Sequence, residues 1–159
     1  MAEDNRKQGE RMYQSLCSML DGMKWKYKKI PEKLMIECSA VGDDLPIPLK
    51  IWVEPDRHTV RFYSHLVYVD KSRLTQVSLA LSAANYALVI GCFDFDLSDG
   101  EISFRLTMPY RDSILSETLL GDLLYTTCST VDRYNDKLDD LIKDKITLND
   151  FIDFVRNKK

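Results

Sequence analysis

The chain has 159 residues, of which 45% are hydrophobic and 30% charged, and its formal net charge is -3. These values are typical of one globular domain spanning residues 1–159. The slightly acidic balance disfavours general nucleic-acid binding, and no apolar run approaches the roughly 18 residues of a membrane span. The polar start MAEDNRKQGERM has no apolar segment behind it, so we expect no secretory signal, a cytoplasmic protein, and no nucleic-acid or membrane partner.

The first helix is predicted from apolar residues at helical spacing, and we expect it to end near Gly22. These residues are Met12, Leu16, Met19, Leu20 and Met23. The following KWKYKK segment is expected to be a solvated connector whose Trp25 and Tyr27 pack inward. A further hypothesis, contact with nucleic acid, would use the lysines of this region, Lys24, Lys26, Lys28 and Lys29.

Three strands follow, because apolar and polar residues alternate in three runs within residues 34–63. The EPDRH turn places Trp52 opposite Arg61, a cation–aromatic pair worth on the order of 0.5–1 kcal/mol. Pro46 and Pro48 favour an edge position for the Trp52 strand, since proline cannot donate a ladder hydrogen bond.

A second helix is predicted from Asp70 or Ser72 to Ala87. Apolar residues cover more than one of its sides, so we expect it to lie between layers or against a second copy of the chain. They include Leu74, Val77, Leu79, Leu81, Ala83 and Ala84. The outer strand face adds Trp52 and Tyr63, aromatic residues of the kind enriched at interfaces. The sequence therefore predicts a homodimer whose contact includes this helix or the Trp52 strand.

The stretch CFDFDLSDGEISFRL gathers four carboxylates in a few residues. Apolar and polar residues alternate on both sides of the Asp-Gly dipeptide at 99–100, which is typical of a two-residue type I′ turn. That turn pairs Asp94 with Arg105 and Asp96 with Ser103. It also places on the buried face the pairs Phe93–Leu106, Phe95–Phe104 and Leu97–Ile102. We interpret these carboxylates as structural; a metal-dependent enzyme using the Asp94/Asp96 face is the alternative, although the spacing does not fit a calcium loop.

Helical spacing resumes at Ser116 or Glu117 and predicts a long helix, and a further helix begins after Thr147. The element order is therefore helix, three strands, helix, two strands, long helix. Antiparallel strands in runs with helices between them favour an α+β fold. We expect a single antiparallel sheet of about five strands with helices packed on it.

Several short motifs recur in a known family. They are an Asn-Tyr pair near a helix end, a glycine before a phenylalanine-containing strand, Asp-Gly with an acidic residue, and Asp-Arg-Tyr in a long helix. Here the residues are Asn85, Tyr86, Gly91, Phe93, Asp99, Gly100, Glu101, Asp132, Arg133 and Tyr134. In these motifs the C-terminal half of the chain resembles the YbjN family of proposed bacterial sensory transduction regulators. The resemblance implies a type III secretion chaperone-like fold, often dimeric, and it brings no established catalytic residues.

No G-x-S-x-G, H-E-x-x-H, P-loop or dinucleotide-binding motif is present. Four widely spaced cysteines and only two histidines give no zinc pattern, and free thiols fit a reducing compartment. We therefore expect a non-enzymatic, chaperone-like binding or regulatory module without a cofactor, which recognises a polypeptide partner or itself. The candidate partner-binding residues are Trp52, Arg61, Tyr63, Leu74, Val77 and Leu81.

Overall fold

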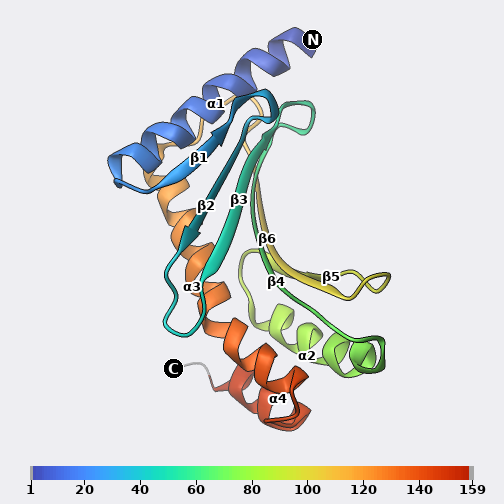
Figure 1. The fold of residues 1–159 in the computed structure, drawn as a ribbon. Coiled ribbons are helices and arrows are strands. Elements are labelled where there is room, and N and C mark those ends of the chain that lie inside the picture. Colours follow the sequence, from blue (N-terminus) through green and yellow to red (C-terminus); the bar gives the residue numbers. More distant parts are fainter. Residues whose placement is uncertain (1, 158–159) are drawn as a thin grey trace.

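A six-stranded antiparallel sheet forms the centre of the protein, and the computed structural model describes residues 2–157 (Figure 1). The strands are β1 (Tyr27–Ile30), β2 (Met35–Ala40), β3 (Ile47–Glu54), β4 (Thr59–Tyr68), β5 (Cys92–Phe95) and β6 (Glu101–Pro109). Their order across the sheet is β1-β2-β3-β4-β6-β5. The predicted α+β class and single antiparallel sheet are confirmed, with six strands rather than five. Residues 1, 158 and 159 of the expected domain lie outside the described residues.

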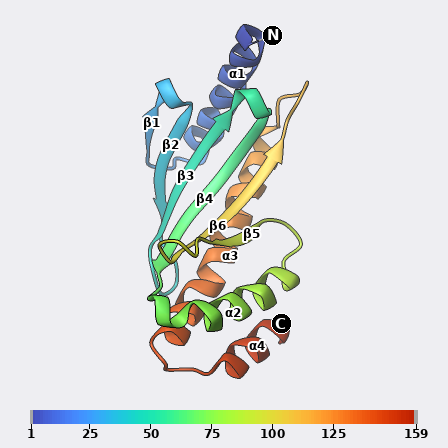
Figure 2. The ribbon, with the colours of Figure 1, turned by 90° about the vertical axis from the view of Figure 1, so that its right-hand side faces the viewer.

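Within residues 2–157, four α-helices accompany the sheet, and the two long ones, α1 (Ala2–Gly22) and α3 (Glu117–Ile142), cover one of its faces. The other two are α2 (Leu74–Ala87) and α4 (Leu148–Arg156). Helices α1 and α3 pack against each other and against the sheet, whereas α2 contacts α4 and β5 at one end of the molecule. Figure 2 shows the opposite face of the sheet, with α1 and α3 behind it and no helix in front. This uncovered side is called the open sheet face below.

The core lies between α1, α3 and the inner sheet face, and it follows from the period-two alternation of the strands. On β3 the four alternate residues Ile47, Leu49, Ile51 and Val53 are buried, and those between them are partly or fully exposed. Apolar residues of α3 at helical spacing complete the core: Leu120, Leu124, Val131 and Leu138.

The lysine-rich connector expected after the first helix is partly a strand. Residues 27–30 form β1 and pair antiparallel with β2, with Tyr27 opposite Cys38. Lysines are common in edge strands, where they hinder pairing with a further strand. With lysines at its two central positions, β1 lacks the alternation of apolar and polar residues that predicted the other strands. The Tyr27 hydroxyl also donates a hydrogen bond to the Asp21 carboxylate (2.8 Å), which fixes the strand to the end of α1.

Two further expectations about helix and strand position are wrong. Helix α1 begins at Ala2, not near Met12, because its polar first turns are supported by the ion pairs Glu3–Lys7 and Arg6–Glu10 at helical spacing. The Trp52 strand, β3, lies between β2 and β4 and is not an edge strand. Pro48 is the second residue of β3, where its missing N–H affects only the start of the ladder.

The β5–β6 hairpin keeps its predicted strands but not its predicted turn. Phe93 pairs with Phe104 and Asp94 with Ser103, so the register is shifted by two residues, and Leu97 is 59% exposed. The connection spans residues 96–100, and among them only Gly100 has a positive φ, so it is not a type I′ turn. Side chains of Asp96 and Asp99 accept backbone N–H groups two residues ahead and stabilise the longer loop.

Gly100 is the residue on which this loop depends. Its φ is +84°, and a Cβ atom there would overlap the carbonyl oxygen of Val69, which belongs to the segment after β4. We expect Gly100→Ala to lower the free energy of unfolding by more than about 1 kcal/mol. Urea unfolding followed by circular dichroism measures this. Gly22→Ala is the control, since its Cβ would meet no atom within 4 Å and alanine is favoured in a helix; equal stability of the two variants would contradict the assignment.

Candidate functional site

The open sheet face carries three of the candidate residues, which β3 and β4 bring side by side. Trp52 pairs with Arg61 in the sheet register, as predicted, and the Arg61 guanidinium lies 5.2 Å from the Trp52 ring centre. The Tyr63 ring is 5.9 Å from the Trp52 ring. All three side chains are partly exposed. Aromatic surface is therefore available in the middle of the sheet face on which no described helix packs.

Most of the charged groups around these aromatic rings are paired with one another, whereas Lys50, opposite Tyr63 in the register, is not part of these pairs. The ion pairs are Arg61–Glu54 (2.9 Å), Arg105–Asp94 (2.6 Å) and Lys28–Glu37 (3.6 Å), and the His65 ring lies 2.9 Å from Glu101. Because most cations of the face have a carboxylate beside them, the face has little net charge to attract a polyanion. Two of the four lysines of the nucleic-acid hypothesis also have a carboxylate nearby: Lys28 lies near Glu37, and Lys29 lies 4.0 Å from Asp21.

Glu101 links two strands of the open sheet face through its side chain. Its carboxylate accepts hydrogen bonds from the Tyr63 hydroxyl (2.5 Å) and from the His65 ring (2.9 Å). The Tyr63 hydrogen bond is the main reason why the pKa of Glu101 lies below its ordinary value, and His65 adds to the effect. Burial, together with Glu101, raises the pKa of Tyr63 to about 12. A cleft of about 370 Å³ adjoins this network, with Lys50 and Tyr68 on its walls.

This network makes part of the stability depend on pH. A carboxylate whose folded pKa is lowered stabilises the fold above the unfolded-state pKa of about 4.3, and the contribution is lost as the pH falls through the folded value. We expect Glu101→Gln to unfold at lower urea concentration than the wild type at pH 7. The difference should shrink as the pH falls from about 5 to about 3. Tyr63→Phe should reduce the same pH dependence, and a difference that stays constant with pH would contradict this account.

The hairpin carboxylates each have their own protein donors. Asp94 accepts two hydrogen bonds from Arg105, through Nε (2.6 Å) and Nη2 (2.9 Å), in the predicted ion pair, although the two residues are diagonal neighbours in the observed register. Asp96 lies in the loop, where it accepts hydrogen bonds from the backbone and the hydroxyl of Ser98. The two carboxylates therefore do not form the shared face on which the metal-dependent alternative depends. Among residues 2–157, no three histidine, cysteine or acidic side chains converge as metal ligands.

The structural reading of Asp94 has a direct test. Asp94→Asn should lower the free energy of unfolding by only a few tenths to about 1 kcal/mol, because the pair is partly exposed. Melting temperatures with and without magnesium, calcium or manganese should show no metal effect that depends on Asp94. A metal-induced rise in melting temperature that disappears in the variant would instead favour a metal site.

Thiol chemistry finds little support in the described residues. The four cysteines Cys17, Cys38, Cys92 and Cys128 are free. Burial raises the pKa of Cys38 to about 12 and that of Cys128 to about 11, so both are neutral thiols at pH 7 and poor nucleophiles.

The remaining candidate residues lie on α2, and the structure turns most of them inward. Val77 is fully buried and Leu81 is 3% exposed, since both face the core. The large apolar side chains that α2 exposes are Leu79 (54%) and Tyr86 (95%), on the opposite side of the helix. The helical period separates these two sets, but it does not say which of them faces the core, because α2 is apolar on more than one side.

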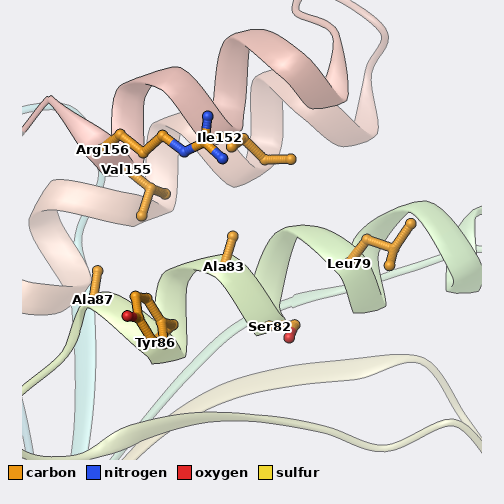
Figure 3. A pocket seen from close by; sticks show the side chains of 8 residues that line it. All are labelled: Leu79, Ser82, Ala83, Tyr86, Ala87, Ile152, Val155 and Arg156. Carbon is orange, nitrogen blue, oxygen red and sulfur yellow. The ribbon is translucent and has the colours of Figure 1, made fainter.

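A groove runs between the exposed side of α2 and helix α4 (Figure 3). Its volume is about 620 Å³, and it is lined by Leu79, Ser82, Ala83, Tyr86 and Ala87 of α2 and by Ile152, Val155 and Arg156 of α4. Figure 3 shows Val155 directed from α4 toward Ala83 and Ala87 on α2. The α4 residues were not predicted as site residues, because nothing in the local sequence indicates which helix lies beside α2.

An aromatic cluster holds α4 in this position. The Tyr134 ring of α3 lies 5.2 Å from Phe93 of β5 and 5.6 Å from Phe154 of α4, and Phe151 lies 6.0 Å from Phe154. Thr147 begins α4 with a reciprocal capping box to Asp150.

Two further contacts fix the elements around α2. Arg73, just before α2, forms a bidentate ion pair with Asp144, which lies in the connection between α3 and α4. At the other end, the Asn85 side chain accepts the Phe93 N–H (2.7 Å) and donates to the Phe93 carbonyl oxygen (3.0 Å). Asn85 thereby satisfies backbone groups of the edge strand β5 and joins it to α2.

Comparison with solved structures shows which fold this arrangement represents. YbjN from E. coli, a proposed transcription regulator, aligns with a TM-score of 0.61 at 11% identity, over 83% of this chain and 92% of that chain. A chain of the ExsC–ExsE complex aligns with a TM-score of 0.59 at 11% identity, over 82% of this chain and 95% of its own. A chain of the HopA1–SchA chaperone–effector complex aligns with a TM-score of 0.55 at 13% identity, over 82% and 97%.

The protein has a YbjN-like, type III secretion chaperone-like fold. The predicted resemblance is therefore confirmed at the level of the fold. No protein-family model matches the sequence, and a search of curated proteins finds no match. Among the described helices, none is long and apolar enough to cross a membrane.

Proposed function

We propose that this chain is a non-enzymatic, chaperone-like binding module, a single domain spanning residues 1–159, which recognises a polypeptide partner or a second copy of itself. The observation that carries the proposal is the open sheet face. It exposes Trp52 and Tyr63 in a surface without excess charge, and no helix of the described chain covers it. Exposed aromatic side chains are typical of the centre of a protein interface.

Structures of the same fold support a polypeptide partner. One neighbour is a chain of a chaperone–effector complex and another is a chain of the ExsC–ExsE complex. At 11–13% identity, these two structures show a shared fold and not a shared activity. The function is therefore argued from the surfaces of this chain. The free, partly buried thiols of Cys38 and Cys128 fit a reducing compartment, and cytoplasmic residence is part of the proposal.

Self-association is the form of this function that the surfaces support most directly. In a two-fold symmetric dimer the same patch meets itself, so any net charge on the patch would be repelled by its own copy. The open sheet face avoids this repulsion because its ion pairs are internal. The exposed side of α2 avoids it in another way, since its 14 residues include no charged side chain. Both surfaces named in the predicted homodimer are therefore compatible with a symmetric contact.

Light scattering at micromolar concentration tests the homodimer, since a monomer has a mass of 18.5 kDa. We expect about twice this mass for the wild type. Loss of the dimer in Trp52→Ala would assign the contact to the open sheet face, and loss in Leu79→Asp would assign it to α2. Tyr125→Ala is the control, because Tyr125 is an exposed residue of α3 and belongs to neither surface. A wild-type mass near 18.5 kDa would leave self-association unsupported.

A further inference from the structure

We propose that the groove between α2 and α4 binds an amphipathic helix of a partner polypeptide, whose apolar side chains enter the groove and whose carboxylate pairs with Arg156. This inference rests on the proposed function, that the chain binds a polypeptide, and it adds the chemistry of that polypeptide. It does not depend on the open sheet face or on self-association.

The walls of the groove fit apolar side chains. Leu79 and Tyr86 supply exposed apolar surface (54% and 95%), and Ile152 adds to it from α4. Ser82 and Ala83 are small, which lets another side chain or helix approach this side of α2 closely. A groove between two helices, partly open along its length, is the shape that accepts a third helix through side chains three and four residues apart.

The charge around the groove specifies the partner further. Arg156 is the one charged residue among the eight that line the groove, and α2 contributes none over its whole length. Four other arginines of the chain, Arg6, Arg61, Arg73 and Arg105, are each paired with a carboxylate. For Arg156, within residues 2–157, the structure shows no such pair, and its side chain is exposed (Figure 3). An arginine at the rim of an apolar groove favours a ligand with an apolar body and a carboxylate.

A second copy of this chain matches the groove less well than an acidic helix does. An isologous contact through α2 would bring a helix without a carboxylate to Arg156. The acidic residues of α4, Asp150 and Asp153, lie outside the groove lining, and Asp150 is already engaged in the cap of its own helix. The charge complementarity that would explain Arg156 must therefore come from a different polypeptide.

Three synthetic helical peptides, each as long as α2, test the proposal. They share leucines at helical spacing and differ at one position, which holds glutamate, glutamine or lysine. Titration of fluorescently labelled peptide with the whole protein should give the tightest binding for the glutamate peptide, by about fivefold over the glutamine peptide. Arg156→Gln should remove this preference, and Arg156→Glu should reverse it in favour of the lysine peptide.

Control variants separate the groove from the rest of the surface. Ala83→Leu should fill the groove and weaken the binding of all three peptides. Arg11→Gln should leave binding unchanged, because Arg11 is an exposed residue of α1, and Figure 1 shows α1 at the other end of the molecule from α2 and α4. Trp52→Ala should also leave it unchanged, so that loss of a dimer and loss of peptide binding are distinguished. Circular dichroism confirms that each variant is folded.

Three results would overturn the proposal. The first is absence of binding for all three peptides. The second is equal affinity of the glutamate and lysine peptides for the wild type. The third is a groove occupied by a second copy, in which case Leu79→Asp abolishes the dimer and peptide binding weakens as the concentration of wild-type protein rises.

Discussion

The aromatic contact between Tyr134 and Phe93 connects the parts of the molecule on which the candidate surfaces depend. Tyr134 lies on α3, the helix that packs on the inner sheet face, and its ring meets Phe93 on the edge strand β5 at 5.2 Å. The same ring meets Phe154 of α4 at 5.6 Å. Because Phe93 is joined to Asn85 through its backbone, α2 is tied to the same cluster. One buried tyrosine thus fixes β5, α2 and α4 relative to α3.

This cluster gives physical roles to the motifs by which the chain resembles the YbjN family. Asp132 accepts the backbone N–H of Asp43 at 2.8 Å and thereby holds the β2–β3 loop against α3. Arg133 lies over the Phe154 ring at 5.0 Å, and Tyr134 enters the core. These three motif residues therefore make packing and loop contacts within the fold.

Helix coverage of one sheet face determines where binding surface is left. Helices α1 and α3 bury the inner residues of β3, β4 and β6, and the outer residues of the same strands remain available. Their charges are compensated within the face, so the exposed aromatic rings dominate its chemistry. The α2–α4 groove differs in this respect, since its single cation has no partner among the described side chains. The two surfaces are therefore suited to different partners.

Local sequence patterns determined much of the fold, because burial on one face imposes a period of two on strands and 3.6 on helices. They predicted the α+β class, the Trp52–Arg61 pairing, the starts of the last two helices near Ser116 and after Thr147, and the Asp94–Arg105 pair. They failed where a strand is polar, as in β1, and where side chains of Asp96 and Asp99 lengthened a loop and shifted the register.

Only the tertiary structure decided which residues share a surface. The helical period separates the buried Val77 from the exposed Leu79, but the sequence does not say which side of α2 meets the core. The groove joins α2 to residues of α4 about seventy positions away in the chain, and no local signal predicts such a contact. Its position depends on the Tyr134 cluster and on the Arg73–Asp144 pair, which are interactions between distant segments. Periodicity groups the residues of each element into faces, and long-range packing decides which face is buried and which faces come together.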